Sequence, residues 1–208
     1  MDTPPSFAVV TAYFNEDRAT LERCIDSVRQ QESPWPIRHY LVADGRPQDL
    51  SPYPELVHLV LPSNHADCGD TPRWMGAMLA LRHACSGLMF LDADNLLHPR
   101  HVARVIHAHQ HVQAPVVLAQ RRLLRRDGSV MPVGVAEEWS RAHVDTNCYA
   151  FFGRARQDAL QWGGIPRELS AVGDRVFWEL LRGKEHPTAV VAEPTIGYTC
   201  QWSHAYEA

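Results

Sequence analysis

Short apolar segments alternate with amphipathic stretches over the first hundred residues, and this alternation constrains the fold more than any other feature of the sequence. Residues 7–10, 39–43 and 56–61 are short runs rich in apolar, strand-forming side chains. Between the first two runs, apolar residues spaced i, i+3, i+4 and i+7 mark one face of a helix: Leu21, Cys24, Ile25 and Val28. A strand–helix–strand order of this kind predicts a parallel sheet with crossover helices.

The alternation continues through a second helix and a fourth strand. Asp70, Thr71 and Pro72 predict a helix start, with a capping side chain followed by proline at the first helical position. Residues 88–91 form an apolar strand, and Pro99 opens a further helix. Ligands of open α/β sheets bind outside the carboxyl ends of the strands. We therefore expect the polar loops that follow the strands to form the site.

The second half of the chain is less regular. Residues 116–124 and 130–133, joined by a turn at Asp127 and Gly128, predict a β-hairpin. Three more elements are expected after it: a strand at 148–152, a short helix at 157–162 and a helix that begins at Asp174. No linker or repeat divides the sequence, so we expect one α/β domain over residues 1–208.

Composition and charge exclude several classes of protein. The chain has 45% hydrophobic and 21% charged residues, which is the balance of a globular protein rather than a disordered one. Its formal net charge of −4 argues against a general nucleic-acid binder, because such proteins normally carry a basic surplus. The net charge does not exclude a local basic patch.

The sequence gives no sign of export or of a membrane anchor. Residues 1–5 lack a basic segment followed by an apolar stretch, so no signal peptide is expected. No apolar run reaches the roughly 20 residues that span a bilayer. The five cysteines are scattered and form no C-x-x-C pair, which favours free thiols in a reducing compartment. We expect a cytoplasmic protein, with peripheral membrane contact left open.

Asp92-Ala93-Asp94 is the sharpest chemical feature. It follows the apolar strand at 88–91 directly, so both carboxylates fall in one loop and are close enough to share a hard divalent cation. Mg²⁺ and Mn²⁺ prefer such oxygen ligands and keep positions open for water and substrate phosphates. The motif alone is weak, since a solvated pair of loop carboxylates has the same sequence, but the preceding strand favours a metal site.

Together with this motif, several other segments make the sequence resemble glycosyltransferase family 2, the inverting enzymes of the GT-A fold. The matching segments are 9–16, 42–45, Arg73, 91–95 with Pro99, 163–168 and 173–178. Their order along the chain is more specific than any one of them. The resemblance implies a Rossmann-like, three-layer α/β/α GT-A fold with a mostly parallel central sheet and a small β-hairpin acceptor region. Residues 1–110 would form the nucleotide-sugar-binding half and 111–208 the acceptor-binding half.

The resemblance also implies a role for each matching residue on the donor side. The backbone at Ala12 and the ring of Phe14 contact the nucleoside, and Glu16 reaches the ribose. Asp44 accepts hydrogen bonds from the base. Arg73 lies against the diphosphate or the edge of the base, where a fixed guanidinium suits anionic oxygens.

The metal and the reaction are assigned by the same resemblance. Asp92 meets the ribose or the metal, Asp94 is the principal ligand of Mn²⁺ or Mg²⁺, and a late histidine, His204, closes the metal site. Asp174 is the general base that deprotonates the acceptor hydroxyl. The implied reaction transfers a sugar, with inversion, from a nucleotide sugar, UDP-sugars being favoured, to a glycan, a lipid-linked or a small-molecule acceptor.

Two departures from the family bear on these roles. The family commonly has proline where this chain has Ala12, and a Glu-Asp pair where it has Gly173-Asp174. Asp174 also suits a helix N-cap irrespective of catalysis. The fallback candidates for the base are Glu137, Glu138 and Asp145.

Other polar clusters have simpler explanations. His204 also fits a surface histidine in a frayed tail. His107 and His111 have zinc-binding spacing, but no carboxylate or cysteine completes a set. Four arginines on the expected hairpin suit an anionic acceptor or an edge that resists aggregation: Arg121, Arg122, Arg125 and Arg126.

Three other functions compete with glycosyl transfer. A haloacid-dehalogenase-type phosphatase also has a strand followed by Asp-x-Asp, but there the motif lies near the N-terminus, and here it begins at Asp92. A sugar nucleotidyltransferase would need a glycine-rich loop after the first strand, and residues 11–16 contain no glycine. A catalytically inactive sugar-nucleotide binder is favoured by one feature, Gly173.

Overall fold

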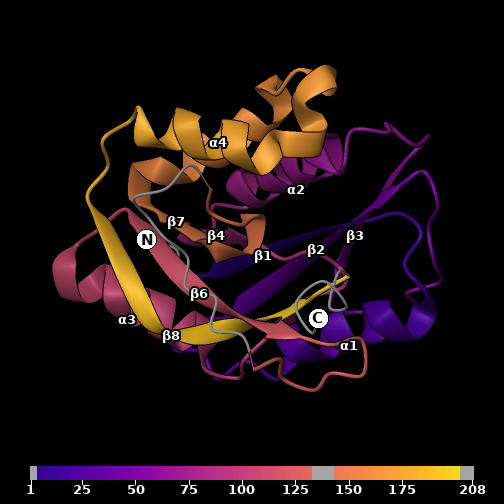
Figure 1. The fold of residues 1–208 in the computed structure, drawn as a ribbon, viewed down its shortest axis with the longest axis horizontal. Coiled ribbons are helices and arrows are strands. Elements are labelled where there is room, and N and C mark those ends of the chain that lie inside the picture. Colours follow the sequence, from indigo (N-terminus) through magenta and orange to yellow (C-terminus); the bar gives the residue numbers. More distant parts are fainter. Residues whose placement is uncertain (1–3, 133–142, 202–208) are drawn as a thin grey trace.

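The computed structural model describes residues 4–132 and 143–201, in which a central sheet lies between two layers of helices (Figure 1). Eight strands form a single sheet in the order β3-β2-β1-β4-β7-β6-β8-β5. The strands are β1 (Phe7–Tyr13), β2 (Ile37–Asp44), β3 (Val57–Leu61), β4 (Gly87–Phe90), β5 (Leu96–Leu97), β6 (Val116–Leu124), β7 (Tyr149–Phe152) and β8 (Thr188–Thr199). The pairs β3–β2, β2–β1, β1–β4 and β6–β8 are parallel, and β4–β7, β7–β6 and β8–β5 are antiparallel.

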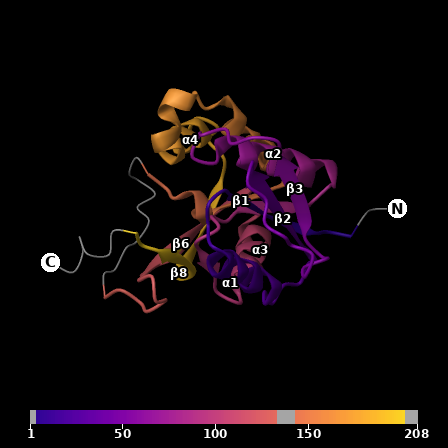
Figure 2. The ribbon, with the colours of Figure 1, turned by 90° about the vertical axis from the view of Figure 1, so that its right-hand side faces the viewer.

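Helices cover both faces of the sheet. They are α1 (Arg18–Arg29), α2 (Asp70–Arg82), α3 (His101–Val112) and α4 (Gly173–Arg182), with short 3₁₀ segments η1 (Thr146–Cys148), η2 (Gly153–Gly164) and η3 (Arg167–Val172). Figures 1 and 2 show α2 and α4 on one face and α1 and α3 on the other. The predicted three-layer fold with a mostly parallel sheet is confirmed. No helix within the described ranges is both long and apolar enough to cross a bilayer.

The helix starts follow local sequence, with one correction. The Asp17 carboxylate caps α1 by accepting a hydrogen bond from Thr20 N–H at 2.8 Å. A capping side chain was expected from Asp70-Thr71, but the N-cap of α2 is Gly69, in the left-handed region at φ 90°, and the carboxylate comes from Asp67, two residues earlier. Asp67 accepts from Thr71 N–H at 2.9 Å. The Asp70 side chain is thereby left for another contact.

The expected hairpin after residue 116 is present only in part. The turn is present, since Gly128 N–H donates to Arg125 O at 2.9 Å, but the return arm is reduced to one bridge between Leu124 and Val130. The β6 strand instead pairs with β7 and with β8, a strand that the sequence did not reveal. Val133, the last residue of the expected arm, lies outside the described residues.

Two elements near the candidate base also differ from expectation. The short helix expected at 157–162 lies within the longer 3₁₀ segment η2. Asp174 lies in the first turn of α4 and is not its N-cap, which is Val172. The rings of Trp162 and Phe177 stack at 4.6 Å between centroids and so tie η2 to the start of α4. Because η2 also packs on α2, this stacking brings the start of α4 close to α2, where Gly173 lies beside Asp70.

Candidate functional site

A cavity of about 590 Å³ opens at the carboxyl ends of β1, β2 and β4, the edge where open α/β sheets bind ligands. Its volume is in the range of small-molecule sites. Seven residues predicted for the donor side all line it: Ala12, Phe14, Glu16, Asp44, Arg73, Asp92 and Asp94. The structure therefore brings together, from four separate segments, the set that the sequence motifs selected.

Asp92 is held from two sides. Arg73 donates from Nη2 to Asp92 Oδ1 at 2.7 Å, and Asn147 donates from Nδ2 to Asp92 Oδ2 at 2.9 Å. The backbone N–H of Asp92 donates to Asn147 Oδ1 at 2.6 Å, so the amide of Asn147 grips both ends of the residue. Both carboxylate oxygens of Asp92 are thus engaged by protein donors.

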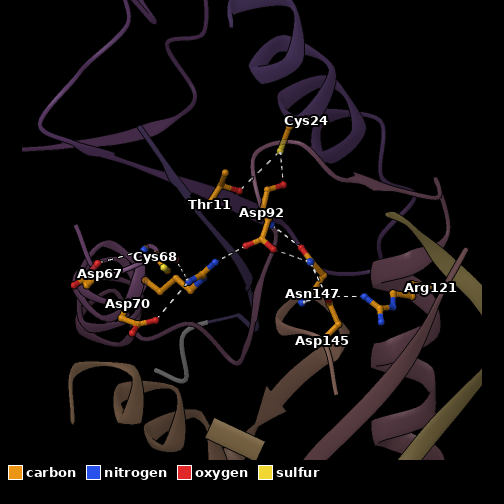
Figure 3. A network of polar contacts seen from close by, with 11 residues as sticks. Thr11, Cys24, Asp67, Cys68, Asp70, Asp92, Arg121, Asp145 and Asn147 are labelled. Carbon is orange, nitrogen blue, oxygen red and sulfur yellow. Dashed lines mark hydrogen bonds and ion pairs between the residues drawn. The ribbon is translucent and has the colours of Figure 1, made fainter. Parts of the chain in front are cut away.

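This contact belongs to a longer chain of polar side chains (Figure 3). Asn147 also donates to Asp145 Oδ1 at 2.6 Å, and Arg121 donates to Asp145 Oδ2 at 2.8 Å. Burial raises the pKa of Asp145, although Arg121 acts against it. The Arg121 guanidinium lies over the ring of Tyr198, 4.6 Å from its centroid. The alternation of acid, amide and guanidinium compensates charges that would be costly if buried singly.

The Arg73 guanidinium is the fixed cation of the cavity. Its Nη1 donates to Cys68 O at 2.9 Å and lies 3.7 Å from Asp70 Oδ1. Its Cζ lies 5.0 Å from the centroid of the Trp162 ring, a cation–π distance. The Arg73 side chain is 12% exposed, so its direction is set by the protein before any ligand arrives.

Asp44 is in the cavity, but its carboxylate already has protein donors. Asn64 donates from Nδ2 to Oδ2 at 2.8 Å, and His65 approaches Oδ1 through its ring Nδ1 at 2.6 Å. The backbone N–H of His65 donates to Oδ2 at 3.1 Å. Asp44 therefore orders the loop after β3 in this structure, and a base would share or replace these donors.

The first loop is ordered by its own backbone. Phe14 N–H donates to Glu16 Oε2 at 2.7 Å, which closes a short turn beside Ala12. The Arg46 guanidinium lies over the Phe14 ring at 4.8 Å from its centroid. This contact holds the Phe14 ring in a loop that lacks the proline that the family commonly carries at the position of Ala12.

Asp94 is the carboxylate best suited to hold a divalent cation. Its Oδ2 accepts one hydrogen bond, from Gln201 Nε2 at 3.2 Å. Burial and the neighbouring negative charge of Asp92 raise the pKa of Asp94 to about 6, which is the environment that a bound cation would relieve. One carboxylate with substrate phosphates is a common arrangement for Mg²⁺. Over residues 4–132 and 143–201, no group of three or more histidine, cysteine, aspartate and glutamate side chains is arranged to bind a metal.

The C-terminal segment returns to this loop. Thr199 Oγ1 donates to the Asp94 carbonyl at 2.5 Å, and Thr199 N–H donates to Asn95 Oδ1 at 2.8 Å. With Gln201 on the carboxylate, the end of β8 is fastened to the Asp-x-Asp loop. His204, predicted as a further metal ligand, lies outside the described residues.

Asp174 lines a second cavity, of about 420 Å³, together with Arg121, Asp145 and Tyr198. His143 Nδ1 lies 2.9 Å from Asp174 Oδ2. Burial acts to raise the pKa of Asp174, but the hydrogen bond and charge of His143 outweigh it, so the pKa lies below its usual range. Asp174 is ionised at neutral pH, as a base must be. Glu137 and Glu138, two of the fallback bases, lie outside the described residues, and Asp145 is occupied by Arg121 and Asn147.

Several site residues escaped the sequence motifs. Asn147 and Tyr198 belong to no motif that the sequence displays, and Asp70 was expected only as part of a helix start. Tyr198 lines both cavities. The clearest available signal was Asp145-Thr146-Asn147, a run of small polar residues before the apolar strand β7. Because β7 is antiparallel to β4, the residues before it lie at the same edge of the sheet as the loop after β4. The run is therefore a candidate for the site by position, although its partners cannot be predicted from the sequence.

The comparisons with known proteins show the fold. No protein-family model matches the sequence, and no curated protein matches it significantly. The crystal structure of S. aureus TarS 1–349 in complex with UDP matches with a TM-score of 0.71 and 15% identity, covering 97% of this chain and 62% of that one. The complex of the same protein with UDP-GlcNAc matches with a TM-score of 0.72 and 15% identity, covering 94% of this chain and 59% of that one. The chain thus spans less than two thirds of these solved chains, and its three-layer α/β fold is the one they contain.

Proposed function

We propose that this protein is a glycosyltransferase, which transfers a sugar with inversion from a nucleotide-sugar donor to an acceptor hydroxyl. One observation carries the proposal. The seven donor-side residues that the motifs select line a single cavity at the carboxyl edge of the sheet, including the two carboxylates of the Asp-x-Asp loop. The TarS structures of the same fold were solved with UDP and UDP-GlcNAc, which favours a UDP-sugar as the donor here.

The net negative charge of the residues that line the cavity favours binding of a donor diphosphate only together with a cation. Arg73 is accompanied there by five acidic side chains: Glu16, Asp44, Asp67, Asp92 and Asp94. A diphosphate entering this cavity alone would be repelled, whereas Asp94 together with the phosphates would hold Mn²⁺ or Mg²⁺. Such a cation stabilises the negative charge that develops on the departing nucleoside diphosphate.

The remaining groups bind and orient the substrates. Phe14 offers an aromatic face to the nucleoside, and Asp44 an acceptor for the base. Arg73, fixed by Asp92 and Cys68, points its guanidinium along the cavity. In the second cavity Asp174, ionised and held by His143, takes the proton of the acceptor hydroxyl. Tyr198 lies at the junction of the two cavities.

Nucleotide titration followed by a turnover assay tests the proposal. UDP, GDP, dTDP and CMP are titrated calorimetrically with Mn²⁺, and the matching nucleotide sugars are then assayed for hydrolysis and transfer. Wild type is compared with Asp94→Ala and with Asp26→Ala, a matched change on the exposed side of α1, where Asp26 pairs with Arg29. Binding of one nucleotide that is lost in Asp94→Ala alone supports the proposal, and absence of binding to all four overturns it.

A binding protein without turnover is the second candidate. Gly173 favours it, because the acidic neighbour expected beside Asp174 is missing. Nucleotide binding without hydrolysis or transfer would establish this function. A phosphatase with Asp92 as nucleophile is disfavoured, since both oxygens of that carboxylate already accept hydrogen bonds from Arg73 and Asn147.

A further inference from the structure

The space beside Gly173 is occupied by a carboxylate from another helix. A Cβ added at Gly173 would lie 3.2 Å from Asp70 Oδ1, 3.4 Å from Asp70 Oδ2 and 3.4 Å from the Trp162 ring. Asp70 comes from the start of α2, about a hundred positions earlier in the chain. The position at which a side chain next to Asp174 would begin is therefore already in contact with an acid.

Asp70 also lies against the fixed cation of the donor cavity. Its Oδ1 is 3.7 Å from Arg73 Nη1, while Arg73 Nη2 donates to Asp92 Oδ1 at 2.7 Å. The guanidinium is thus placed between two carboxylates, with the Trp162 ring at 5.0 Å from Cζ. Asp70 lies at the start of α2 and Asp92 in the loop after β4, so the two carboxylates labelled in Figure 3 come from different elements.

Stability does not account for the Asp70 carboxylate. Asp70 is 3% exposed, and burial raises its pKa to about 6 although Ser170 and Arg73 act to lower it. An acid with a raised folded-state pKa stabilises the fold when protonated, and that contribution is lost as the pH rises from about 4 through about 6. At pH 7.5 the ionised carboxylate therefore stabilises the fold less than the protonated one would.

We infer that Asp70 supplies, from α2, the acidic group that Gly173 leaves out beside the candidate base, and that it acts as a positioning residue for Arg73. The inference rests on the proposed function. The two positions are exclusive: a glutamate at 173 would direct its carboxylate to the place that Asp70 occupies, because one methylene and the carboxyl carbon separate its oxygens from Cβ. An acid at either position compensates Arg73, whereas acids at both positions would repel each other.

The first test replaces the charge and keeps the shape. Asp70→Asn should raise the melting temperature at pH 7.5 and change it less at pH 4.5, while lowering kcat for sugar transfer by roughly 10- to 100-fold, the usual effect of removing a supporting partner. A residue that merely supports the fold would lower both the melting temperature and the activity. Wild-type turnover in Asp70→Asn would overturn the inference.

The second test exchanges the two positions. Gly173→Glu alone should lower the melting temperature and turnover, whereas in Asp70→Ala it should raise turnover above that of the single Asp70→Ala variant. Gly183→Glu is the matched control, because it adds the same charge at the far end of α4, where the new Cβ meets only backbone oxygens at 3.6 Å. A double variant that folds and is no more active than Asp70→Ala would overturn the inference.

Melting temperatures separate this inference from the proposed function. If the wild type turns over no donor, the proposed function fails, and the stability cycle still tests the shared position. Gly173→Glu should then destabilise the wild type more than it destabilises Asp70→Ala. An equal loss in both backgrounds would show that the two side chains do not compete, whatever the activity. If the double variant does not fold, kcat and the melting temperature of Asp70→Asn decide.

Discussion

Replacing Asn147 by alanine should destabilise the protein severely, although the residue is small and lies in no recognisable motif. Asn147 is fully buried and makes three side-chain hydrogen bonds. It accepts from Asp92 N–H at 2.6 Å and donates to the carboxylates of Asp92 at 2.9 Å and Asp145 at 2.6 Å. Bonds to charged groups contribute about 1.5 kcal/mol each and the neutral one about 1 kcal/mol, so the loss is about 4 kcal/mol.

Thermal and urea unfolding of Asn147→Ala measure this loss. For a chain of this length 4 kcal/mol corresponds to a fall in melting temperature of about 8–16 °C. The comparison is Asn15→Ala, which removes an exposed asparagine that accepts one bond, from Arg46 at 2.7 Å, and should change stability by no more than about 0.5 kcal/mol. A loss below about 1 kcal/mol in Asn147→Ala would refute the reasoning, since it would mean that Asp92 and Asp145 do not depend on this amide.

The charge of the network gives the same prediction a second, pH-dependent form. Asn147→Asp keeps the acceptor for Asp92 N–H but places a third carboxylate against Asp92 and Asp145. The new acid can be accommodated only when protonated, so its folded-state pKa is raised above the unfolded value. The variant should approach wild-type stability near pH 4 and lose it as the pH rises toward 7. A stability difference that is constant over this range would contradict the assignment of donors and acceptors.

Four further variants test the residues of the two cavities. Asp94→Ala should abolish Mn²⁺-dependent binding of the cognate nucleotide in calorimetry with little change in melting temperature, and undiminished turnover in excess EDTA would contradict the metal assignment. Asp44→Ala should weaken nucleotide binding by about 1–3 kcal/mol and also lower the melting temperature, because Asn64 and His65 lose their acceptor; unchanged affinity would leave it a loop-ordering residue alone. Asp174→Asn should lower kcat about 100-fold with donor affinity unchanged. His143→Ala should move the acidic limb of the pH–rate profile to higher pH, because His143 holds the pKa of Asp174 down.

The donor half of the fold could be predicted because its signals are local. An apolar run followed by a polar loop, then the spacing of Leu21 to Val28, specifies strand, site and helix within one stretch of chain. The structure places β1, α1 and β2 accordingly. The seven predicted residues of this cavity lie at or just after strand ends or on α2, so the sequence pattern and the family resemblance together located them.

The acceptor half could not be predicted as well because its strands depend on distant partners. The first residues of β8 alternate between exposed and buried. The alternation then breaks around Pro194, where a bulge divides the pairing with β6 into two parts. Proline and an interrupted alternation argue against a strand when only neighbouring residues are considered. The paired arm of the hairpin was assigned to residues 130–133 because they were the next apolar segment, whereas β6 finds its parallel partner over sixty positions later.

The same limit applies to the site. Asp92, Asp94 and Asp174 belong to motifs, and so does Arg73, but Asn147, which orients Asp92, does not. Arg73, Asn147 and their neighbours form one continuous series between the two cavities. Three of its four links join residues far apart in sequence, and the fourth joins Asn147 to Asp145, two positions away. Pairings of this kind are specified by the packing of the sheet.

The position of that series explains why it would matter for transfer. Arg73 and Asp92 line the first cavity, and Asp145 and Arg121 line the second cavity, which also contains Asp174. Asn147 joins the two pairs from the core. Transfer with inversion requires the acceptor hydroxyl and the anomeric carbon to meet within a few tenths of an ångström of the reactive geometry. A wall whose polar groups are all bonded to one another moves little when either substrate binds, so the two cavities keep their relative placement. A single change at Asn147 should therefore affect both donor and acceptor binding, whereas a change at Asp94 or Asp174 should affect one of them.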